Sequence, residues 1–335
     1  MVEQGTHKPL AGGSNPPSAT TPHDALAHAV DAGASRLAIP DDVTIVLAVS
    51  GGPDSMALLH GAASLVQTDV RGWHLTVAHL DHTLRPDSAD DARFVAEAAE
   101  ALALRFEGRR TDVAALARDE GRSVEDAARE ARYRFLEDVA PDSALIATAH
   151  TADDAAETVI LNLLRGSGLA GARGIPARRG RIVRPLLDVR RATLRDLLDA
   201  AGIGYRLDPS NNDPAFLRNR VRHEVIPLVE EVRPGAAERI GQFSRLAADD
   251  DALLDDMARA ELEKRTTEDG IDWHDPPVPA LGRRVLRLAI GEPPPSAERI
   301  EALLEAAAGG RGGVTIELGA GRVASVRQRR IRILT

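Results

Sequence analysis

The stretch VLAVSGGPDS, residues 46–55, decides how the first half of this chain folds. Its apolar letters complete a run over 43–49 that is typical of a strand buried on both faces of a parallel sheet. The sequence MALLHGAASLV that follows, 56–66, predicts a helix. Ligands of open α/β sheets bind beyond the carboxyl ends of the strands. There, glycines allow the backbone to approach the ligand closely, and a helix N-terminus supplies N–H groups. The stretch therefore predicts a phosphate-binding turn.

The residue types of this turn narrow the ligand. No lysine follows the glycines, so the turn is not the G-x-x-x-x-G-K-[ST] loop, and its spacing does not match G-x-G-x-x-G. An aspartate without a lysine suits a pyrophosphate group with a magnesium ion, which Asp54 would help to hold. The plainer alternative is a glycine turn in which Asp54 or Ser55 only caps the helix. The predicted nucleotide site comprises the six turn residues Ser50, Gly51, Gly52, Pro53, Asp54 and Ser55.

Strands and helices alternate from this turn to about residue 165. Further strands are predicted over 73–80 and 143–149, and helices over 88–104, 123–140 and 152–165. Alternation on this scale indicates an α/β fold with a doubly wound parallel sheet.

Beyond Gly166 the pattern changes. A glycine-rich loop leads to a predicted strand over 181–187 and a helix over 191–202, and long helices follow from 215 to about 265. Alternating runs over 313–334 predict a terminal hairpin. We expect a disordered leader over 1–22, an α/β domain over 23–215, and a mainly helical domain with that hairpin over 216–335.

Composition excludes several classes of protein. The chain contains no cysteine, so disulfides, thiolate metal sites, iron–sulfur clusters and persulfide chemistry are excluded. The N-terminal residues lack the apolar core of a secretory signal, and no segment approaches the roughly 20 apolar residues of a membrane span. We expect a cytoplasmic protein that does not bind membranes.

The charge is unevenly distributed along the chain. The net charge of -9 argues against a nucleic-acid partner. However, arginines gather between 171 and 195, in RNRVR at 218–222 and in the C-terminal tail, and a globally acidic protein can still carry a phosphate-binding face. The alternative is a solvated, arginine-rich loop. The first group comprises arginines 173, 178, 179, 181, 184, 190, 191 and 195.

Four motifs together resemble a known family. S-G-G-x-D-S after a first strand is the signature of the ATP-pyrophosphatase (PP-loop) superfamily. The segments HLDHTLRPDSADDARFV (79–95), ATAHTADDAAETVILNLLRGSGLAGARGIP (147–176) and DPSNNDPAFLRNRVRHEVIPLVEEVRP (208–234) are similar to those of tRNA(Ile)-lysidine synthetases. The chain departs from their pattern at Thr151, where a second histidine is usual, and at Ala155, where glutamine is frequent.

The resemblance implies an activity, cofactors and partners. The family uses ATP and Mg²⁺ to join free L-lysine to C2 of the wobble cytidine of the tRNA(Ile) that has a CAU anticodon. An adenylated cytidine is the intermediate, and AMP and pyrophosphate are the products. The C-terminal domain would bind tRNA, and a homodimer is left open.

Three other functions are compatible with the nucleotide site. A thiolating PP-loop enzyme usually needs cysteines, which this chain lacks. An ammonia-dependent ligase of the NAD- or GMP-synthetase type would not call for the arginine groups. A nucleotide-binding regulatory module would bind ATP without lysine-dependent turnover.

A second group of side chains predicts an amine receptor. His150, Asp154 and Glu157 are spaced so that a helix over 152–165 would align them on one face, where two carboxylates and an imidazole can receive an ammonium group. The resemblance associates the same residues with lysine recognition, and the carboxylates could help to deprotonate the amine. The alternative is that Asp153 and Asp154 complement the helix dipole while Glu157 is solvated.

The remaining candidates are histidines and arginines near the two sites. His79 and Asp81 follow the second strand and are expected beside the nucleotide; a transition-metal site at H-x-D-H, which includes His82, is the less favoured alternative. Arg129 and Arg132 resemble the family's A-R-x-x-R-Y and would meet phosphate or the substrate base, unless they form a structural salt bridge. Arg218 and Arg222 are candidates for contact with tRNA or lysine.

Overall fold

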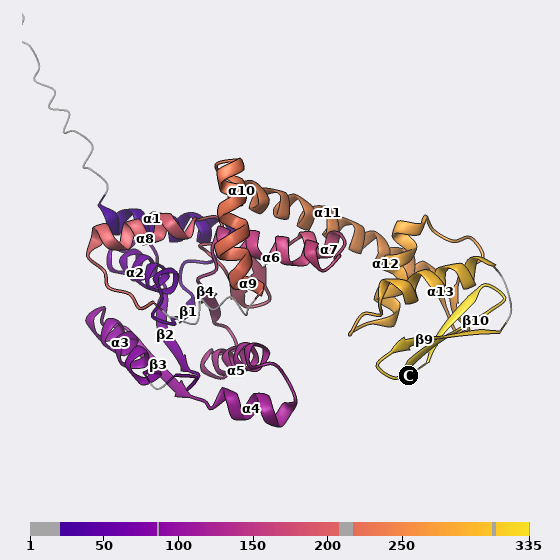
Figure 1. Ribbon diagram of the computed structural model, residues 1–335, viewed down its shortest axis with the longest axis horizontal. Coiled ribbons are helices and arrows are strands. Elements are labelled where there is room, and N and C mark those ends of the chain that lie inside the picture. The colour runs from indigo at the N-terminus through magenta and orange to yellow at the C-terminus, as the bar shows by residue number, and fades with distance from the viewer. Residues whose placement is uncertain (1–20, 86, 208–216, 310–312, 335) are drawn as a thin grey trace, which may run out of the picture. The chain divides into compact units, whose positions relative to one another are not determined.

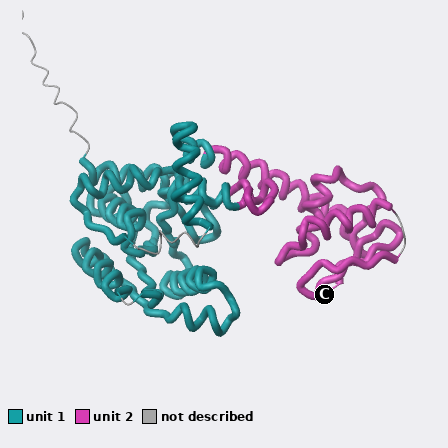
Figure 2. The backbone as a smooth tube through the Cα atoms, viewed as in Figure 1, with its two compact units in different colours: residues 1–161, 175–241 teal, residues 162–174, 242–335 magenta. Residues whose placement is uncertain are grey.

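The computed structural model describes residues 21–85, 87–207, 217–309 and 313–334. They form two compact units, one running up to residue 161 and over 175–241, the other over 162–174 and from 242 onward (Figure 2). The chain passes from the first unit to the second within helix α6 (Ala152–Leu164), returns between residues 174 and 175, and passes to the second unit again within helix α11 (Ala236–Arg265). The predicted leader, apart from its last two residues, and the boundary predicted between 215 and 216 lie outside the described residues.

A six-stranded sheet forms the first unit, with the order β3-β2-β1-β4-β6-β5 (Figure 1). All neighbouring strands are parallel except β5 and β6. The chain moves from β1 through β2 to β3 and returns to the other side of β1 with β4, which confirms the doubly wound sheet. Ligands of such sheets bind where the order reverses, here between β1 and β4. The strands are β1 (Thr44–Ala48), β2 (His74–Asp81), β3 (Arg105–Arg110), β4 (Leu145–Thr148), β5 (Arg178–Arg179) and β6 (Ile182–Val183).

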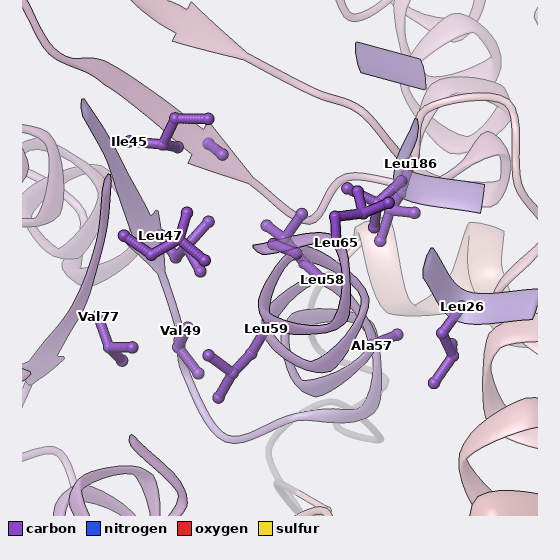
Figure 3. Packing of buried hydrophobic residues seen from close by; sticks show 14 of the residues in the cluster. Leu26, Ile45, Leu47, Val49, Ala57, Leu58, Leu59, Leu65, Val77 and Leu186 are labelled. Carbon is purple, nitrogen blue, oxygen red and sulfur yellow. The ribbon is translucent and has the colours of Figure 1, made fainter. Parts of the chain in front are cut away.

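Helices cover both faces of this sheet, which explains the uninterrupted apolar run at β1. Ile45 and Leu47 belong to one core, whereas Val46 points into another, because side chains alternate along a strand. Figure 3 shows Ile45 and Leu47 beside Leu58 and Leu59 of α2. The first core includes residues of α1 (Pro22–Arg36), α2 (Pro53–Gln67), α3 (Ser88–Ala101) and α8 (Arg191–Ala201), and the second includes residues of α4 (Val113–Glu120) and α5 (Val124–Val139).

A third, smaller core fixes the segment after residue 217 against α6. Ala156 and Leu161 of α6 pack with Val221, Ile226 and Ala237. This packing holds the short helix α9 (Leu217–Arg220), the π-helical turn Val221–Val225 and α10 (Ile226–Val232) next to the acidic end of α6.

Three elements of this unit, β3, α1 and α4, are not among those predicted from the sequence. The strand β3 reads RFEGRR and is largely exposed at the edge of the sheet, where charged residues are common because they discourage pairing with other chains. Helix α1 is opened by a capping box of Thr21 and Asp24. Helix α4 is short and is capped by Asp112.

The strand predicted over 181–187 is wrong in length. Only Ile182 and Val183 are in β6, because the chain turns at Pro185, which has no N–H to donate to a neighbouring strand. Leu186 and Leu187 are apolar because they are buried after the turn, not because they extend a strand.

The second unit combines helices with an antiparallel sheet of order β7-β8-β11-β10-β9. The predicted hairpin exists as β9 and β10, but β11 and β8 extend it. Trp273, Leu286 and Leu303 lie in its core. No helix of the described chain is both long and apolar enough to span a bilayer. The unit's elements are α7 (Leu169–Ala172), most of α11, β7 (Thr266–Thr267), β8 (Gly270–Asp272), α12 (Pro279–Ile290), α13 (Ala297–Gly309), β9 (Val314–Gly319), β10 (Arg322–Arg327) and β11 (Arg330–Leu334).

Candidate active site

The turn between β1 and α2 has the backbone of an anion site. Gly51 has a φ of +87°, in the left-handed region that favours glycine, and Gly52 is the N-cap of α2. Ser55 closes the turn: its hydroxyl donates to the carbonyl oxygen of Gly52 at 2.8 Å and accepts from the N–H of Ser50 at 3.2 Å. The cap residue has no side chain to occupy the first N–H groups of α2, so these groups suit an anionic ligand.

Asp54 lies in the first turn of α2 and offers one unused oxygen. Its Oδ2 accepts from Nε of Arg191 at 2.9 Å, whereas Oδ1 is buried and has no hydrogen-bond partner among the described residues. Burial raises the pKa of Asp54, and Arg191 opposes this shift. A buried, unpartnered carboxylate oxygen beside a phosphate-binding turn is a suitable ligand for Mg²⁺, which prefers oxygen.

Asp154 and Glu157 meet beside this turn, as the sequence predicts. Asp154 uses Oδ2 to accept from the backbone N–H of Thr151 at 2.9 Å and from its hydroxyl at 2.8 Å. Thr151, one of the two departures from the family pattern, therefore has a role in starting α6, in the manner of a capping box. Glu157 is fully buried, which argues against the alternative of a solvated side chain.

Three arginines occupy these carboxylates. Arg191 donates from Nη2 to Oδ1 of Asp154 at 2.8 Å and from Nη1 to Oε1 of Glu157 at 3.2 Å. Arg222 donates from Nε to Oε1 of Glu157 at 2.7 Å, and Arg218 donates from Nε to Oε2 of Glu157 at 3.0 Å. With Asp54, three carboxylates thus face three guanidinium groups. We call these six residues the ion-pair cluster.

The cluster sets the protonation of its members. Burial alone would raise the pKa of Asp154, but Arg191, His150 and Arg218 lower it far below its usual value. The neighbouring carboxylates raise the pKa of Arg191 despite its burial. Burial lowers the pKa of His150 to about 4, so its imidazole is neutral at pH 7; Nδ1 lies 2.9 Å from the hydroxyl oxygen of Thr148.

His79 and Asp81, which the sequence analysis expects to follow the second strand, lie within its last three residues, because β2 extends to Asp81. His79 donates from Nδ1 to the carbonyl oxygen of Val49 at 2.8 Å and so ties β2 to the residue preceding the turn. Asp81 accepts from the N–H of Thr83 at 2.9 Å and shapes the loop after β2. Within the described residues, no group of three or more histidine, aspartate or glutamate side chains is arranged to hold a metal ion.

Arg129 and Arg132 lie near aromatic and imidazole groups instead of carboxylates. The guanidinium of Arg129 is 5.2 Å from the ring centre of Tyr133, and that of Arg179 is 5.5 Å from the same ring. Nη2 of Arg132 lies 3.5 Å from Nε2 of His82. In the described part of the chain neither Arg129 nor Arg132 has a carboxylate partner, so the salt-bridge alternative finds no support.

From the sequence, Arg179 and Arg191 are candidates only as members of the arginine group 171–195, and Tyr133 is not among the candidates. Charge alone does not separate Arg191 from its neighbours. Arg190, the preceding residue, pairs instead with Asp153 and Glu230. The sequence predicts a helix that begins at Arg191, but it does not reveal that this end of α8 lies beside the carboxylates of α6.

The sequence is similar to those of known proteins over much of its length. A family model described as the PP-loop domain matches residues 26–229. A tRNA(Ile)-lysidine synthase of Geobacter sulfurreducens is 43% identical over 258 residues, which cover 73% of this chain and 54% of that protein. One of Thermus thermophilus is 46% identical over 229 residues, 68% of this chain and 43% of that protein. The chain thus spans about half the length of these curated relatives.

A solved structure supports the fold. The U34-tRNA thiolase NcsA of Methanococcus maripaludis, determined with its [4Fe-4S] cluster, superposes with a TM-score of 0.54 at 16% identity, covering 67% of this chain and 78% of that one. At this identity the likeness extends to the fold alone.

Proposed function

Because the chain belongs to the ATP-utilising PP-loop domain family, we propose that it is a tRNA(Ile)-lysidine synthetase, which joins free L-lysine to C2 of the wobble cytidine of the CAU-anticodon tRNA(Ile). The observation that carries the proposal is the ion-pair cluster, in which Asp54 of the nucleotide turn and the two carboxylates of α6 lie within reach of one guanidinium. The relatives named above support the choice of substrate.

The reaction has two steps, one served by Asp54 and its turn and the other by the α6 carboxylates Asp154 and Glu157. The cytidine O2 attacks the α-phosphate of ATP and pyrophosphate leaves; the ε-amino nitrogen of lysine then attacks C2 and AMP leaves. The N–H groups at the start of α2 would hold the leaving pyrophosphate, and Asp54 would hold Mg²⁺ through Oδ1, which has no hydrogen-bond partner among the described residues. When bound, Mg²⁺ would neutralise phosphate charge. Asp154 orients the ammonium group and Glu157 accepts its proton, since only the neutral amine is a nucleophile.

Fewer arginines are available to bind tRNA than the sequence groups contain. Arg190 and Arg191 are held by carboxylates, Arg184 is buried, and Arg330 and Arg332 of the tail pair with Asp269. Arginines that already bind protein groups contribute little to phosphate binding.

Around Tyr133, in contrast, Arg129 and Arg179 stack on one aromatic ring. Guanidinium planes and aromatic rings both stack on unpaired bases, which RNA-binding proteins read outside the helix. We place the contact with the anticodon loop at Arg129, Arg132, Tyr133 and Arg179.

The experiment is the release of AMP and pyrophosphate from ATP, with a tRNA(Ile) transcript and each of the twenty amino acids or ammonia. We expect turnover that requires the tRNA and is completed only by lysine. Asp54→Asn should lower it at least 100-fold, while Asp126→Asn, an exposed aspartate in the first turn of α5, should not. Turnover with ammonia and without RNA would contradict the proposal and favour a small-molecule ligase. ATP binding without turnover would favour a regulatory module.

A further inference from the structure

The guanidinium of Arg191 marks the position of a cation between two carboxylates. Its Nε, Nη1 and Nη2 donate to three different residues, Asp54, Glu157 and Asp154, at 2.9, 3.2 and 2.8 Å. The side chain is only 13% exposed, and the backbone N–H of Arg191 donates to Oδ2 of Asp153 at 2.7 Å. The group is therefore held on every edge by the protein.

This arrangement conflicts with a free amine receptor. Oδ1 of Asp154 and Oε1 of Glu157 both point at Arg191, and a substrate ammonium needs the same two acceptors. Arg218 and Arg222 also contact these carboxylates, and the three guanidinium groups already balance the three negative charges. A second cation binds poorly at a site whose charge is already compensated.

Arg191 differs from the other two arginines in one respect. Among the described residues, it alone donates both to the carboxylates of α6 and to Asp54 of the nucleotide turn. Asp54 is also the candidate ligand of the metal that accompanies ATP. Once Asp54 pairs with a metal, Arg191 loses one of its three anchors, and a phosphate group near the turn offers its guanidinium another partner.

Resting on the proposed function, we propose that Arg191 is a positioning residue that links the two sites. In the free protein its guanidinium fills the amine position between Asp154 and Glu157. When a nucleotide binds, Asp54 pairs with the accompanying metal in place of Arg191, and the guanidinium leaves that position. Lysine then takes the vacated position. The consequence is that nucleotide and lysine bind with positive coupling, which by linkage is reciprocal.

The first test uses the unmodified protein and measures binding only. The dissociation constant of L-lysine is determined by titration calorimetry with and without Mg²⁺ and a non-cleavable ATP analogue. We expect lysine to bind about tenfold more tightly when the nucleotide is present, a typical allosteric coupling. Equal affinity in both conditions would overturn the linking role and leave the proposed function intact. No lysine binding in either condition would overturn both.

Two substitutions test the direction of the effect. Arg191→Gln vacates the position, so lysine should bind more tightly than in the parent protein without nucleotide, and the nucleotide should no longer change its affinity. Asp54→Asn weakens the ion pair that holds Arg191 at the nucleotide turn, so it should also tighten lysine binding in the absence of nucleotide. A merely structural Arg191 would give the opposite result, weaker lysine binding in both conditions, and that outcome would overturn the proposal.

The matched control is Arg190→Gln. Arg190 precedes Arg191, is 21% exposed, and pairs with Asp153 of the same helix α6, but it contacts none of the three carboxylates of the ion-pair cluster. The lysine affinity of this variant should keep its tenfold dependence on nucleotide. Loss of the dependence in Arg190→Gln would show that any change at this end of α8 has the same effect, and would also overturn the specific role of Arg191.

Discussion

At the scale of the residue, His82 makes the free energy of unfolding depend on pH. Burial, together with the nearby Arg132, lowers its pKa to about 4. Its Nδ1 is buried without a hydrogen-bond partner among the described residues. Unfolded histidine takes up a proton near pH 6.5, so between pH 6.5 and 4 the unfolded state binds more protons than the folded state. The free energy of unfolding therefore falls as the pH is lowered through this range.

Replacing His82 should remove this dependence. Between pH 7 and pH 5 the parent protein should lose about 2 kcal/mol more of its free energy of unfolding than His82→Gln, measured by urea denaturation. His74→Gln, at the exposed start of β2, is the control and should behave like the parent. The same loss in parent and His82→Gln would show that the folded protein protonates His82 readily.

A second prediction at this scale concerns Glu157. Its carboxylate is fully buried and accepts from all three arginines of the ion-pair cluster. Glu157→Gln leaves these guanidinium groups with too little negative charge, and breaking a buried ion pair in this way costs about 3–5 kcal/mol. Thermal or urea unfolding measures the loss. Glu137→Gln, on the exposed face of α5, should change stability by less than about 0.5 kcal/mol. A small effect at Glu157 would mean that water reaches the cluster.

At the scale of the element, the close packing of α1 on α2 depends on a glycine. A Cβ placed on Gly61 of α2 would lie 2.7 Å from the carbonyl oxygen of Leu26 and 2.6 Å from a methyl group of Val30, both in α1. The two helices therefore approach closely only because this position has no side chain. In an open helix the same glycine would be unfavourable, since alanine has the higher helix propensity.

The prediction is a reversal of that ordinary preference. Gly61→Ala should lower the free energy of unfolding by about 1–3 kcal/mol, because the helices must move apart. Gly241→Ala in α11, where an added Cβ would meet no atom within 4 Å, should raise it by up to about 1 kcal/mol. Urea denaturation of both variants gives the comparison. Stabilisation by Gly61→Ala would show that α1 adjusts without cost.

At the scale of the whole molecule, the two compact units have separate hydrophobic cores. Among the described residues, the buried clusters around the sheet of the first unit and the cluster around Leu286 and Leu303 of the second have no member in common. Two cores of this kind usually unfold in separate steps, so a single two-state transition is not expected.

Calorimetry can assign the two steps. Leu303→Ala, at a fully buried position of α13, should cost the second unit about 2–5 kcal/mol and lower one transition. Mg²⁺ with a non-cleavable ATP analogue, at about 100 times its dissociation constant, should raise the other transition through about 2.7 kcal/mol of binding energy. If both treatments moved one common transition, the units would unfold as one.

The sequence by itself determined the strand β1, the turn after it and the doubly wound sheet. These features are local: an uninterrupted apolar run, two glycines and a regular alternation of strand and helix patterns each depend on neighbouring residues. The same holds for Asp154 and Glu157, whose spacing along one helix predicts that they meet. Edge strand β3 escaped prediction because its exposed residues need no apolar pattern.

Only the tertiary structure decided that Arg191 joins Arg218 and Arg222 at the site, and that these arginines bind the α6 carboxylates. Arg191, Arg218 and Arg222 lie 34, 61 and 65 residues from Glu157 along the chain, and the fold brings them to one buried point. The sequence does not distinguish the adjacent arginines Arg190 and Arg191, yet they pair with different carboxylates. Long-range ion pairs depend on where helices pack, and that packing is a property of the whole fold rather than of any one stretch.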